Sequence, residues 1–321
     1  MFRNKVYYEI KPLLPVWMRR ATRRWVTQRK RNRVKDIWPI LPGSQAPPVG
    51  WPGWPQNRRF AFVLTHDVEG PGGLAKCRQL MKCEMKLGFR SCFNFIPEGP
   101  YGVPKSLRDE LTTNGFEIGV HDLRHDGKLY RSRREFARNA QRINRYLKDW
   151  GAVGFRSGFM LHNLDWAHDL DLLYEASTFD TDPFEPQPDG LQTIFPKWIP
   201  RPDSGNGQSH AKDLKALSGC RRGYLELPYT LAQDSTLFLL LAEQTPEIWF
   251  KKVEWLAAQG GMVLVDTHPD YMAFQGSRNG HWEYPIALYE QLLQHLASNY
   301  REQFWHALPK EVALYWHQVM P

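Results

Sequence analysis

The sequence predicts an α/β protein in which a parallel sheet is covered on its outer side by helices. Apolar segments with strand character recur along the chain, and most are followed by a segment with helical character. Strands that alternate with helices form parallel sheets. About seven such units fall within about 260 residues, which favours a closed β/α barrel over an open sheet. With 321 residues, 42% of them hydrophobic, the chain can bury a large core.

The predicted strands are short apolar runs, at 60–65, 89–95, 116–120, 153–157, 176–180, 224–228 and 261–268. Helices are expected between or after them, at 74–87, 106–114, 133–150 and 165–174, then in the segment that runs to 259, and at 284–300. A long irregular insertion is expected after the fifth strand.

The first 40 residues differ from the rest of the chain in charge. They hold 12 Lys or Arg against two acidic residues, Glu9 and Asp36, whereas the remainder is slightly acidic. A helix over 16–38 would place Trp17, Ala21 and Trp25 on one side, which is typical of a basic helix at a membrane interface. A solvated helix or one that docks on a partner protein is the alternative. Because the basic charge lies outside the folded body, we expect no nucleic-acid partner.

A proline-rich stretch follows the basic segment and is expected to be a linker or an extended arm. The boundary is therefore predicted near Arg58, with a tail and arm at 1–57 and one catalytic domain at 58–321. The four cysteines, Cys77, Cys83, Cys92 and Cys220, fit no zinc motif, redox motif or disulfide framework. No signal peptide is visible. We expect a cytoplasmic protein that associates peripherally with the inner membrane through residues 1–40.

Acidic, histidine and arginine side chains follow five of the predicted strands. In a β/α barrel the carboxyl ends of all strands open onto one face, where active sites lie. The candidate site residues are Asp67 and Glu69 after the first strand, His121 and His125 after the third, Arg156 after the fourth, Asp180 and Asp182 after the fifth, and His268 after the last.

These residue types indicate metal-assisted hydrolysis of an acyl group. His121 and His125, four residues apart, would point the same way from one helical turn. Together with one carboxylate from the first strand they would form a three-ligand metal site with an open position. The ligand is Asp67 or Glu69, and the other carboxylate could act as the base.

The remaining candidates would complete such a site. His268 could protonate a leaving amine or alcohol, and Arg156 could orient the base or bind an oxyanion. Asp180, Asp182 or Asp266 could accept the second ring N–H of His268 and raise its pKa. Taken singly, each of these residues also has a structural explanation, such as a helix cap or an ion pair.

The order of these motifs resembles the polysaccharide deacetylase family, carbohydrate esterase family 4, over residues 58–300. The family opens with Thr-Phe-Asp-Asp-Gly, and "THDVE" places Asp67 at its base position, Val68 at its metal-ligand position and Glu69 one residue later. Relatives similar to aminoarabinose-lipid deformylases carry Asp-x-Asp there, which is compatible with Glu69 as a ligand. The family's His-Ser-x-x-His matches "HDLRH", His121 to His125.

The other motifs match more loosely. "FRSGF" retains the arginine, Arg156, and approximately the glycine of Arg-x-Pro-x-Gly. "FDTDPF", with Asp180 and Asp182, resembles the motif whose aspartate tunes the acid histidine, and "LVDTH" resembles Leu-x-His, with His268 as that acid.

The resemblance implies a distorted (β/α)7 barrel that binds a divalent metal, most often zinc, through Glu69, His121 and His125. It implies removal of an acetyl or formyl group from the nitrogen of a sugar, in a lipid- or nucleotide-linked glycan or a cell-envelope polysaccharide. An O-deacetylase, a small amide hydrolase on the same scaffold and a weakly catalytic glycan-binding protein are the alternatives.

Overall fold

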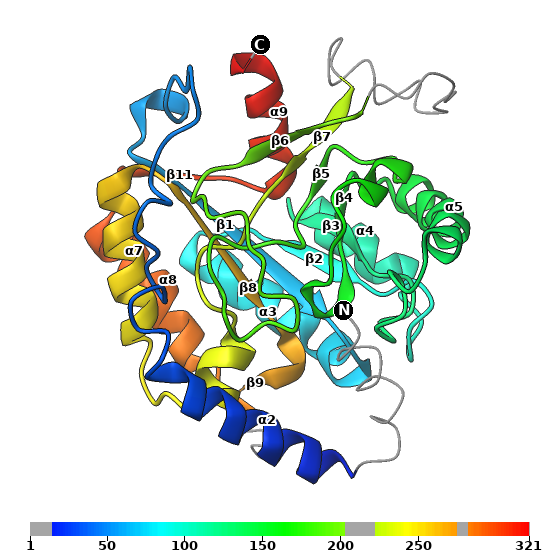
Figure 1. The fold of residues 1–321 in the computed structure, drawn as a ribbon, viewed down its shortest axis with the longest axis horizontal. Coiled ribbons are helices and arrows are strands. Elements are labelled where there is room, and N and C mark those ends of the chain that lie inside the picture. The colour runs from blue at the N-terminus through cyan, green and yellow to red at the C-terminus, as the bar shows by residue number, and fades with distance from the viewer. Residues whose placement is uncertain (1–14, 203–221, 275–281, 321) are drawn as a thin grey trace.

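The computed structural model describes residues 15–202, 222–274 and 282–320, so Cys220 lies outside the described residues. It has a curled, mostly parallel sheet of nine strands with helices around it (Figure 1). The strands that correspond to the seven predicted ones are β1 (Phe60–Val68), β2 (Cys92–Phe95), β3 (Glu117–His121), β4 (Gly154–Arg156), β5 (Tyr174–Glu175), β7 (Gly223–Glu226) and β8 (Met262–Thr267). The predicted α/β class and distorted barrel are confirmed.

The long strand β1 is the centre of the sheet. It pairs in parallel with β8 on one side, and on the other with β2 through its last residues and with β11 (Phe304–His306) through its first. The order then runs from β2 through β3, β4, β5 and β7 to β6 (Lys197–Pro200), which is antiparallel to β7. Strands β6 and β11 were not predicted from the sequence.

The sheet curls until the chain after β7 meets β8. The backbone N–H groups of Thr230 and Leu231 both donate to the carbonyl of Leu264, at 2.9 and 3.1 Å. The hydroxyl of Thr230 extends this contact by donating to Met262 O at 2.7 Å. A few hydrogen bonds therefore close the barrel at this seam in place of a continuous ladder.

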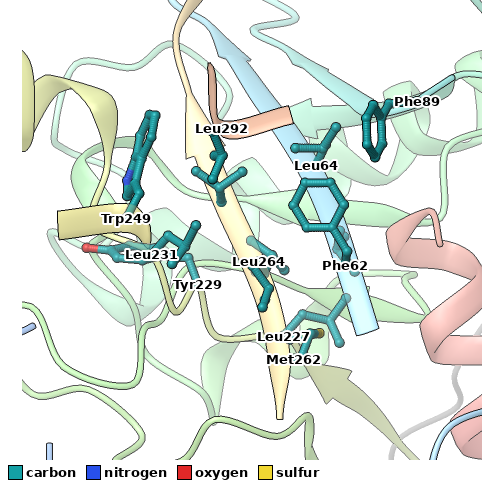
Figure 2. Packing of buried hydrophobic residues seen from close by; sticks show 14 of the residues in the cluster. Phe62, Leu64, Phe89, Leu227, Tyr229, Leu231, Trp249, Met262, Leu264 and Leu292 are labelled. Carbon is teal, nitrogen blue, oxygen red and sulfur yellow. The ribbon is translucent and has the colours of Figure 1, made fainter. Parts of the chain in front are cut away.

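Helices cover the outer side of the sheet, and apolar side chains of β1 and β8 form the core beneath them (Figure 2). Gly88 and Gly151 end two of the helices in left-handed conformations, with φ of 84° and 64°, that favour glycine. The helices are α3 (Pro71–Leu87), α4 (Lys105–Thr113), α5 (Arg133–Trp150), α7 (Glu247–Gln259), α8 (Ala287–Asn299) and α9 (Pro309–Val319).

The helix predicted at 165–174 is wrong. Only a 3-10 turn, Trp166–Asp169, forms there, and β5 begins earlier than predicted. The side chain of Asn144 on α5 explains the difference, because it donates to Asp169 O at 3.0 Å and accepts from Asp171 N at 2.9 Å. These contacts hold the backbone extended as it enters β5. Helix α9, near the end of the chain, was not predicted.

The basic segment is helical from Val16 to Arg31 in α2, and the arm after it packs against the domain. Val34, Trp38 and Trp54 belong to the main hydrophobic core, and the ammonium of Lys252 donates to Pro39 O at 2.5 Å. Trp17 lies in this helix, but its side chain is outside what the structure describes. Among the described helices, none combines the length and the apolar composition needed to cross a bilayer.

Candidate metal centre and catalytic site

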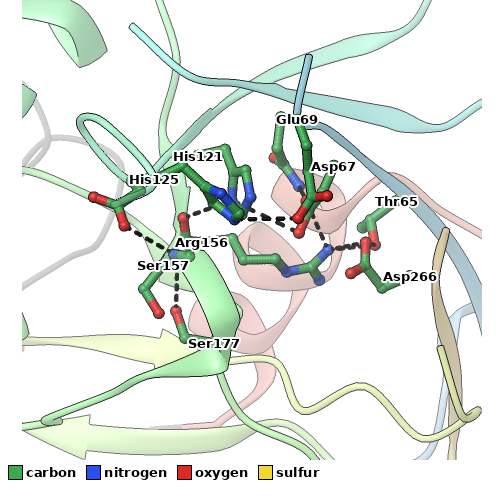
Figure 3. Close-up of polar contacts among 12 residues, drawn as sticks. Thr65, Asp67, Glu69, His121, His125, Arg156, Ser157, Ser177 and Asp266 are labelled. Carbon is green, nitrogen blue, oxygen red and sulfur yellow. Dashed lines mark hydrogen bonds and ion pairs between the residues drawn. The ribbon is translucent and has the colours of Figure 1, made fainter. Parts of the chain in front are cut away.

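Three predicted ligands meet at the carboxyl edge of the sheet. Glu69 directly follows β1, His121 ends β3, and His125 lies in the loop after β3. Each residue offers one ligand atom, and the three atoms lie within 4.8 Å of one another. Nε2 of His125 is 3.2 Å from Oε1 of Glu69 (Figure 3). Two imidazoles and one carboxylate form the donor set of many catalytic zinc sites.

The hydrogen bonding of the two imidazoles fits a metal ion. Nδ1 of His121 lies 3.1 Å from the carbonyl oxygen of Arg156, so its N–H can donate there and leave Nε2 with a free lone pair. Nε2 of His121 is buried and has no hydrogen-bond partner among the described residues, and Nε2 of His125 faces Oε1 of Glu69. Burial also lowers the pKa of His121 and thereby favours the neutral ring that a metal requires.

The loop that brings the two histidines together is not a helical turn, so that part of the prediction is wrong. Asp122 and His125 both adopt φ of 55°, and the imidazole rings lie 4.8 Å apart. The carboxylate of Asp122 stabilises the loop by accepting from Leu123 N at 2.5 Å and from Gly158 N at 3.2 Å. The left-handed backbone conformations of Asp122 and His125, and not a helical turn, thus bring the two imidazole rings together.

Two residues that the sequence analysis missed hold Glu69 in place. The hydroxyl of Tyr271 donates to Oε2 of Glu69 at 2.5 Å, which leaves Oε1 facing His125. The carboxylate of Asp270 accepts from the backbone N–H of Glu69 at 2.8 Å and from that of Gly73 at 3.0 Å. Val68 is fully buried in the core, so its position cannot supply a ligand.

Asp67 lies beside the metal cluster and is fixed by neutral and charged donors. Asn94 donates to its Oδ1 at 2.9 Å, and the guanidinium of Arg156 lies 3.3 Å from the same oxygen. Burial alone would raise the pKa of Asp67, but the guanidinium of Arg156 and the hydrogen bond from Asn94 oppose it, and the pKa is lowered below its usual value. Asp67 is therefore ionised at neutral pH and can accept a proton.

A second group of possible ligands, formed by Asp67, Asp266 and His268, also lies within 4.8 Å. The guanidinium of Arg156 already forms ion pairs with both carboxylates of this group. A cation placed there would meet a fixed positive charge, so the cluster with Glu69 is the better metal site.

The partner of His268 is Asp234, and the prediction of Asp180, Asp182 or Asp266 is wrong. Nδ1 of His268 lies 2.7 Å from Oδ1 of Asp234, whose Oδ2 accepts the backbone N–H of His268 at 2.8 Å. Burial lowers the pKa of His268, but the charge of Asp234 dominates and raises it well above its usual value.

The three expected partners are engaged elsewhere. Asp180 forms a buried ion pair with Lys252 at 2.5 Å, Asp182 accepts from the hydroxyl of Tyr229 at 2.9 Å, and Asp266 pairs with Arg156. Asp234 follows β7, which corresponds to the sixth predicted strand. No candidate site residue was predicted after this strand or after the second one. Because Asp234 stands before Ser235 and an apolar run, its sequence signal is that of a helix cap.

These groups line one cavity of about 400 Å³. Asp67, Glu69, His121, His125 and His268 form its polar part. Its apolar part consists of Phe159, Met160, Phe184, Pro186, Leu239, Leu240 and Trp282, and the N-terminal helix contributes Arg23. Asp180, Asp182 and Arg156 are not among the lining residues.

No protein-family model and no curated protein matches this sequence. Among solved structures, a predicted polysaccharide deacetylase from Mycobacterium smegmatis has a TM-score of 0.59 with this chain at 16% sequence identity, covering 84% of this chain and 94% of that one. The chain has the polysaccharide deacetylase fold. The resemblance expected from the sequence motifs is therefore confirmed at the level of the fold.

Two more distant structures share less of the fold. A predicted polysaccharide deacetylase involved in O-antigen biosynthesis from Bordetella bronchiseptica has a TM-score of 0.43 at 17% identity, covering 78% of this chain and 85% of that one. The catalytic domain of a peptidoglycan N-acetylglucosamine deacetylase from Eubacterium rectale has a TM-score of 0.42 at 14% identity, covering 82% and 94%.

Gly158 is expected to control metal affinity, because a Cβ atom at this position would lie 2.6 Å from Cδ2 of His125 and 2.7 Å from Oδ2 of Asp122. Gly158→Ala should displace the His125 ring and weaken zinc binding about 10–100-fold, as supporting residues of metal sites do. Competition with a chromophoric chelator measures the affinity. Gly102→Ala, where a Cβ meets nothing within 4 Å, is the control. Equal affinities of the two variants would contradict this role.

Proposed function

We propose that this protein is a metal-dependent hydrolase that removes an N-acyl group, acetyl or formyl, from a sugar of a glycan. The observation that carries the proposal is that one cavity holds both a three-residue metal cluster and two groups suited to proton transfer, Asp67 and His268. The carbohydrate deacetylase fold supports a glycan substrate. The glycan would be lipid- or nucleotide-linked, or part of a cell-envelope polysaccharide.

Glu69, His121 and His125 would hold the divalent ion, for which zinc is our first choice because of the two imidazole ligands. When bound, such an ion lowers the pKa of a coordinated water to about 7 and polarises the acyl oxygen. The donor set fits this use, because Nε2 of His121 has no partner among the described residues and Nε2 of His125 faces the carboxylate of Glu69.

The residues of the chain would manage the protons of the reaction. Asp67 accepts a proton from the attacking water, and Arg156 and Asn94 hold its Oδ1 so that Oδ2 faces the cluster. His268 donates a proton to the sugar nitrogen as the carbon–nitrogen bond breaks. The carboxylate of Asp234 fixes the His268 ring and keeps it protonated at neutral pH.

The protonated state of His268 favours an amide substrate over an ester. An amine is a far poorer leaving group than an alcohol, so an amidase depends more on a strong proton donor. The O-deacetylase remains the second candidate function. Ester hydrolysis would depend little on a strong proton donor. The His268–Asp234 pair, which supplies such a donor, is the most completely hydrogen-bonded part of this site.

The roles of the two carboxylates after β1 can be separated by substitution. Glu69→Ala should lose the metal, because two histidines hold a divalent ion poorly. Asp67→Asn should retain the metal and lose about 10²–10⁴-fold in kcat, the usual contribution of a general base. Metal content and acetate or formate release from N-acylated sugars are the measurements. Metal loss in Asp67→Asn but not in Glu69→Ala would reverse the assignment. Unchanged turnover in Asp67→Asn would mean that another group is the base, and no turnover in the wild type would indicate a glycan-binding protein.

The pH dependence of kcat/KM should report the His268–Asp234 pair. His268 must be protonated to act, so activity falls as the pH rises through its elevated pKa. Asp234→Asn removes the charge that opposes burial, which lowers this pKa and moves the alkaline limb to lower pH. Asp182→Asn is the matched control, because that carboxylate contacts Tyr229 and not His268. An alkaline limb at the same pH in Asp234→Asn and wild type would exclude His268 as the acid.

We also propose that helix α2 binds an anionic membrane surface, at the inner face of the cytoplasmic membrane. Met18, Trp25 and Val26, which lie on one side of α2, are 41, 54 and 48% exposed. The guanidinium of Arg29 lies 4.0 Å from the ring centre of Trp25, so basic and apolar groups share this face. Exposed aromatic and aliphatic groups among arginines are typical of helices that lie in a membrane interface.

Substitution of this face should weaken membrane binding without removing the helix. Met18→Ala with Trp25→Ala should reduce binding to phosphatidylglycerol vesicles about tenfold or more, because both lose apolar area that the bilayer would bury. Co-sedimentation at low and high salt is the measurement, and affinity should fall as salt screens the arginines. Val49→Ala, at a position 99% exposed on the arm, is the control. If wild type ignored these vesicles at low salt, a protein partner would replace the membrane.

A further inference from the structure

The N-terminal helix reaches the cavity that holds the candidate catalytic residues. Arg23 of α2 lines this cavity together with Asp67 and His268, although it lies 37 residues before the start of β1. Thr236, Leu239 and Leu240, from the segment that α2 contacts, line the same cavity. The substrate site therefore includes a segment outside the barrel (Figure 1).

Contacts on the inner face of α2 fix the direction in which Arg23 points. Thr27, one turn after Arg23, is buried, and the ammonium of Lys30 donates to Pro183 O. Arg31 pairs with Glu243 at 2.6 Å, and Val34 enters the core. Residues at this spacing share one side of a helix, so the helix that these contacts anchor turns Arg23 toward the domain and Trp25 toward solvent.

Arg23 forms no ion pair or hydrogen bond with another described residue. Its charge acts at longer range on Glu185, where it opposes the rise in pKa. Glu185 also lines the cavity and accepts from the hydroxyl of Tyr229 at 3.1 Å. Burial and the neighbouring Asp182 raise the pKa of Glu185 to about 8, so most of it is neutral at pH 7. The cavity mouth thus presents an uncompensated guanidinium.

We infer that Arg23 binds a phosphate group attached to the sugar, so that the substrate is a sugar phosphate and α2 is part of its binding site. This inference rests on the proposed function, which places the N-acyl group of the sugar at Asp67 and His268. A cavity of about 400 Å³ has the size of a site for a small ligand. Arg23 is the one arginine or lysine among the described residues that line this cavity, so an anionic group on the ligand would pair with it. A guanidinium pairs with phosphate through two parallel hydrogen bonds.

The phosphate could belong to a soluble sugar phosphate or to a lipid carrier. Both present the same ester next to the sugar. The helix that carries Arg23 also exposes an apolar face with Met18 and Trp25, which would favour the lipid. The test below separates the two sources.

Binding to the full-length protein tests this role independently of turnover. The probes are N-acetylglucosamine and N-acetylglucosamine 1-phosphate, measured by calorimetry. Wild type should bind the phosphate about tenfold or more tightly than the neutral sugar, the size expected for hydrogen bonds to a charged group. Arg23→Gln should abolish this difference and leave the neutral sugar unaffected. Arg24→Gln, next on the same helix but not lining the cavity, should retain it.

Two results would overturn the inference: wild type without preference for the phosphate, or Arg23→Gln with the preference intact. If Arg23 confers the preference but no acyl group is released from either sugar, the proposed hydrolase fails while the phosphate site stands. A third probe, the same sugar phosphate esterified to a short prenyl chain in micelles, identifies the carrier. Tighter binding that Trp25→Ala removes indicates a lipid, and equal binding indicates a soluble carrier.

Discussion

The structure of the site depends on one buried charge, the guanidinium of Arg156. It has no exposed surface and reaches from β4 across the inside of the curled sheet to β1 and β8. Its Nη1 contacts Asp67, Asp266 and the hydroxyl of Thr65, and its Nε donates to Ala176 O at 2.7 Å. Burial of an unpaired guanidinium would be strongly unfavourable, so the strands must place these acceptors together.

The backbone of the same residue also serves the metal cluster. The carbonyl of Arg156 accepts from Asp122 N at 2.7 Å and lies 3.1 Å from Nδ1 of His121. Arg156 therefore affects the ionisation of Asp67 with its side chain and the orientation of the His121 ring with its carbonyl. It is not among the residues that line the cavity, which fits a positioning role.

Neighbouring charged groups, and not burial, decide whether Asp67 and His268, the candidates for proton transfer, are charged. Burial opposes the charged form of Asp67 and of His268, yet the guanidinium of Arg156 helps to keep Asp67 ionised and the carboxylate of Asp234 keeps His268 protonated. Where a weaker set of partners is present, burial prevails: Asp182, bonded to Phe184 N and Tyr229, has its pKa raised to about 6.

The sequence by itself determined the fold class, the succession of seven parallel strands along the chain, and that His121, His125 and a carboxylate after the first strand would meet at one edge of the sheet. These follow from local patterns, because apolar runs define strands and the carboxyl ends of parallel strands share one edge. Tertiary structure alone decided which carboxylate pairs with His268, how the loop from Asp122 to His125 turns, and that Arg23 reaches the cavity. Each of these depends on the path of a long connection: the insertion after β5 delivers Asp180 to Lys252, and the chain after β7 delivers Asp234 to His268. Spacing along a chain fixes neighbours within one element, but contacts between distant segments are set by how those segments pack.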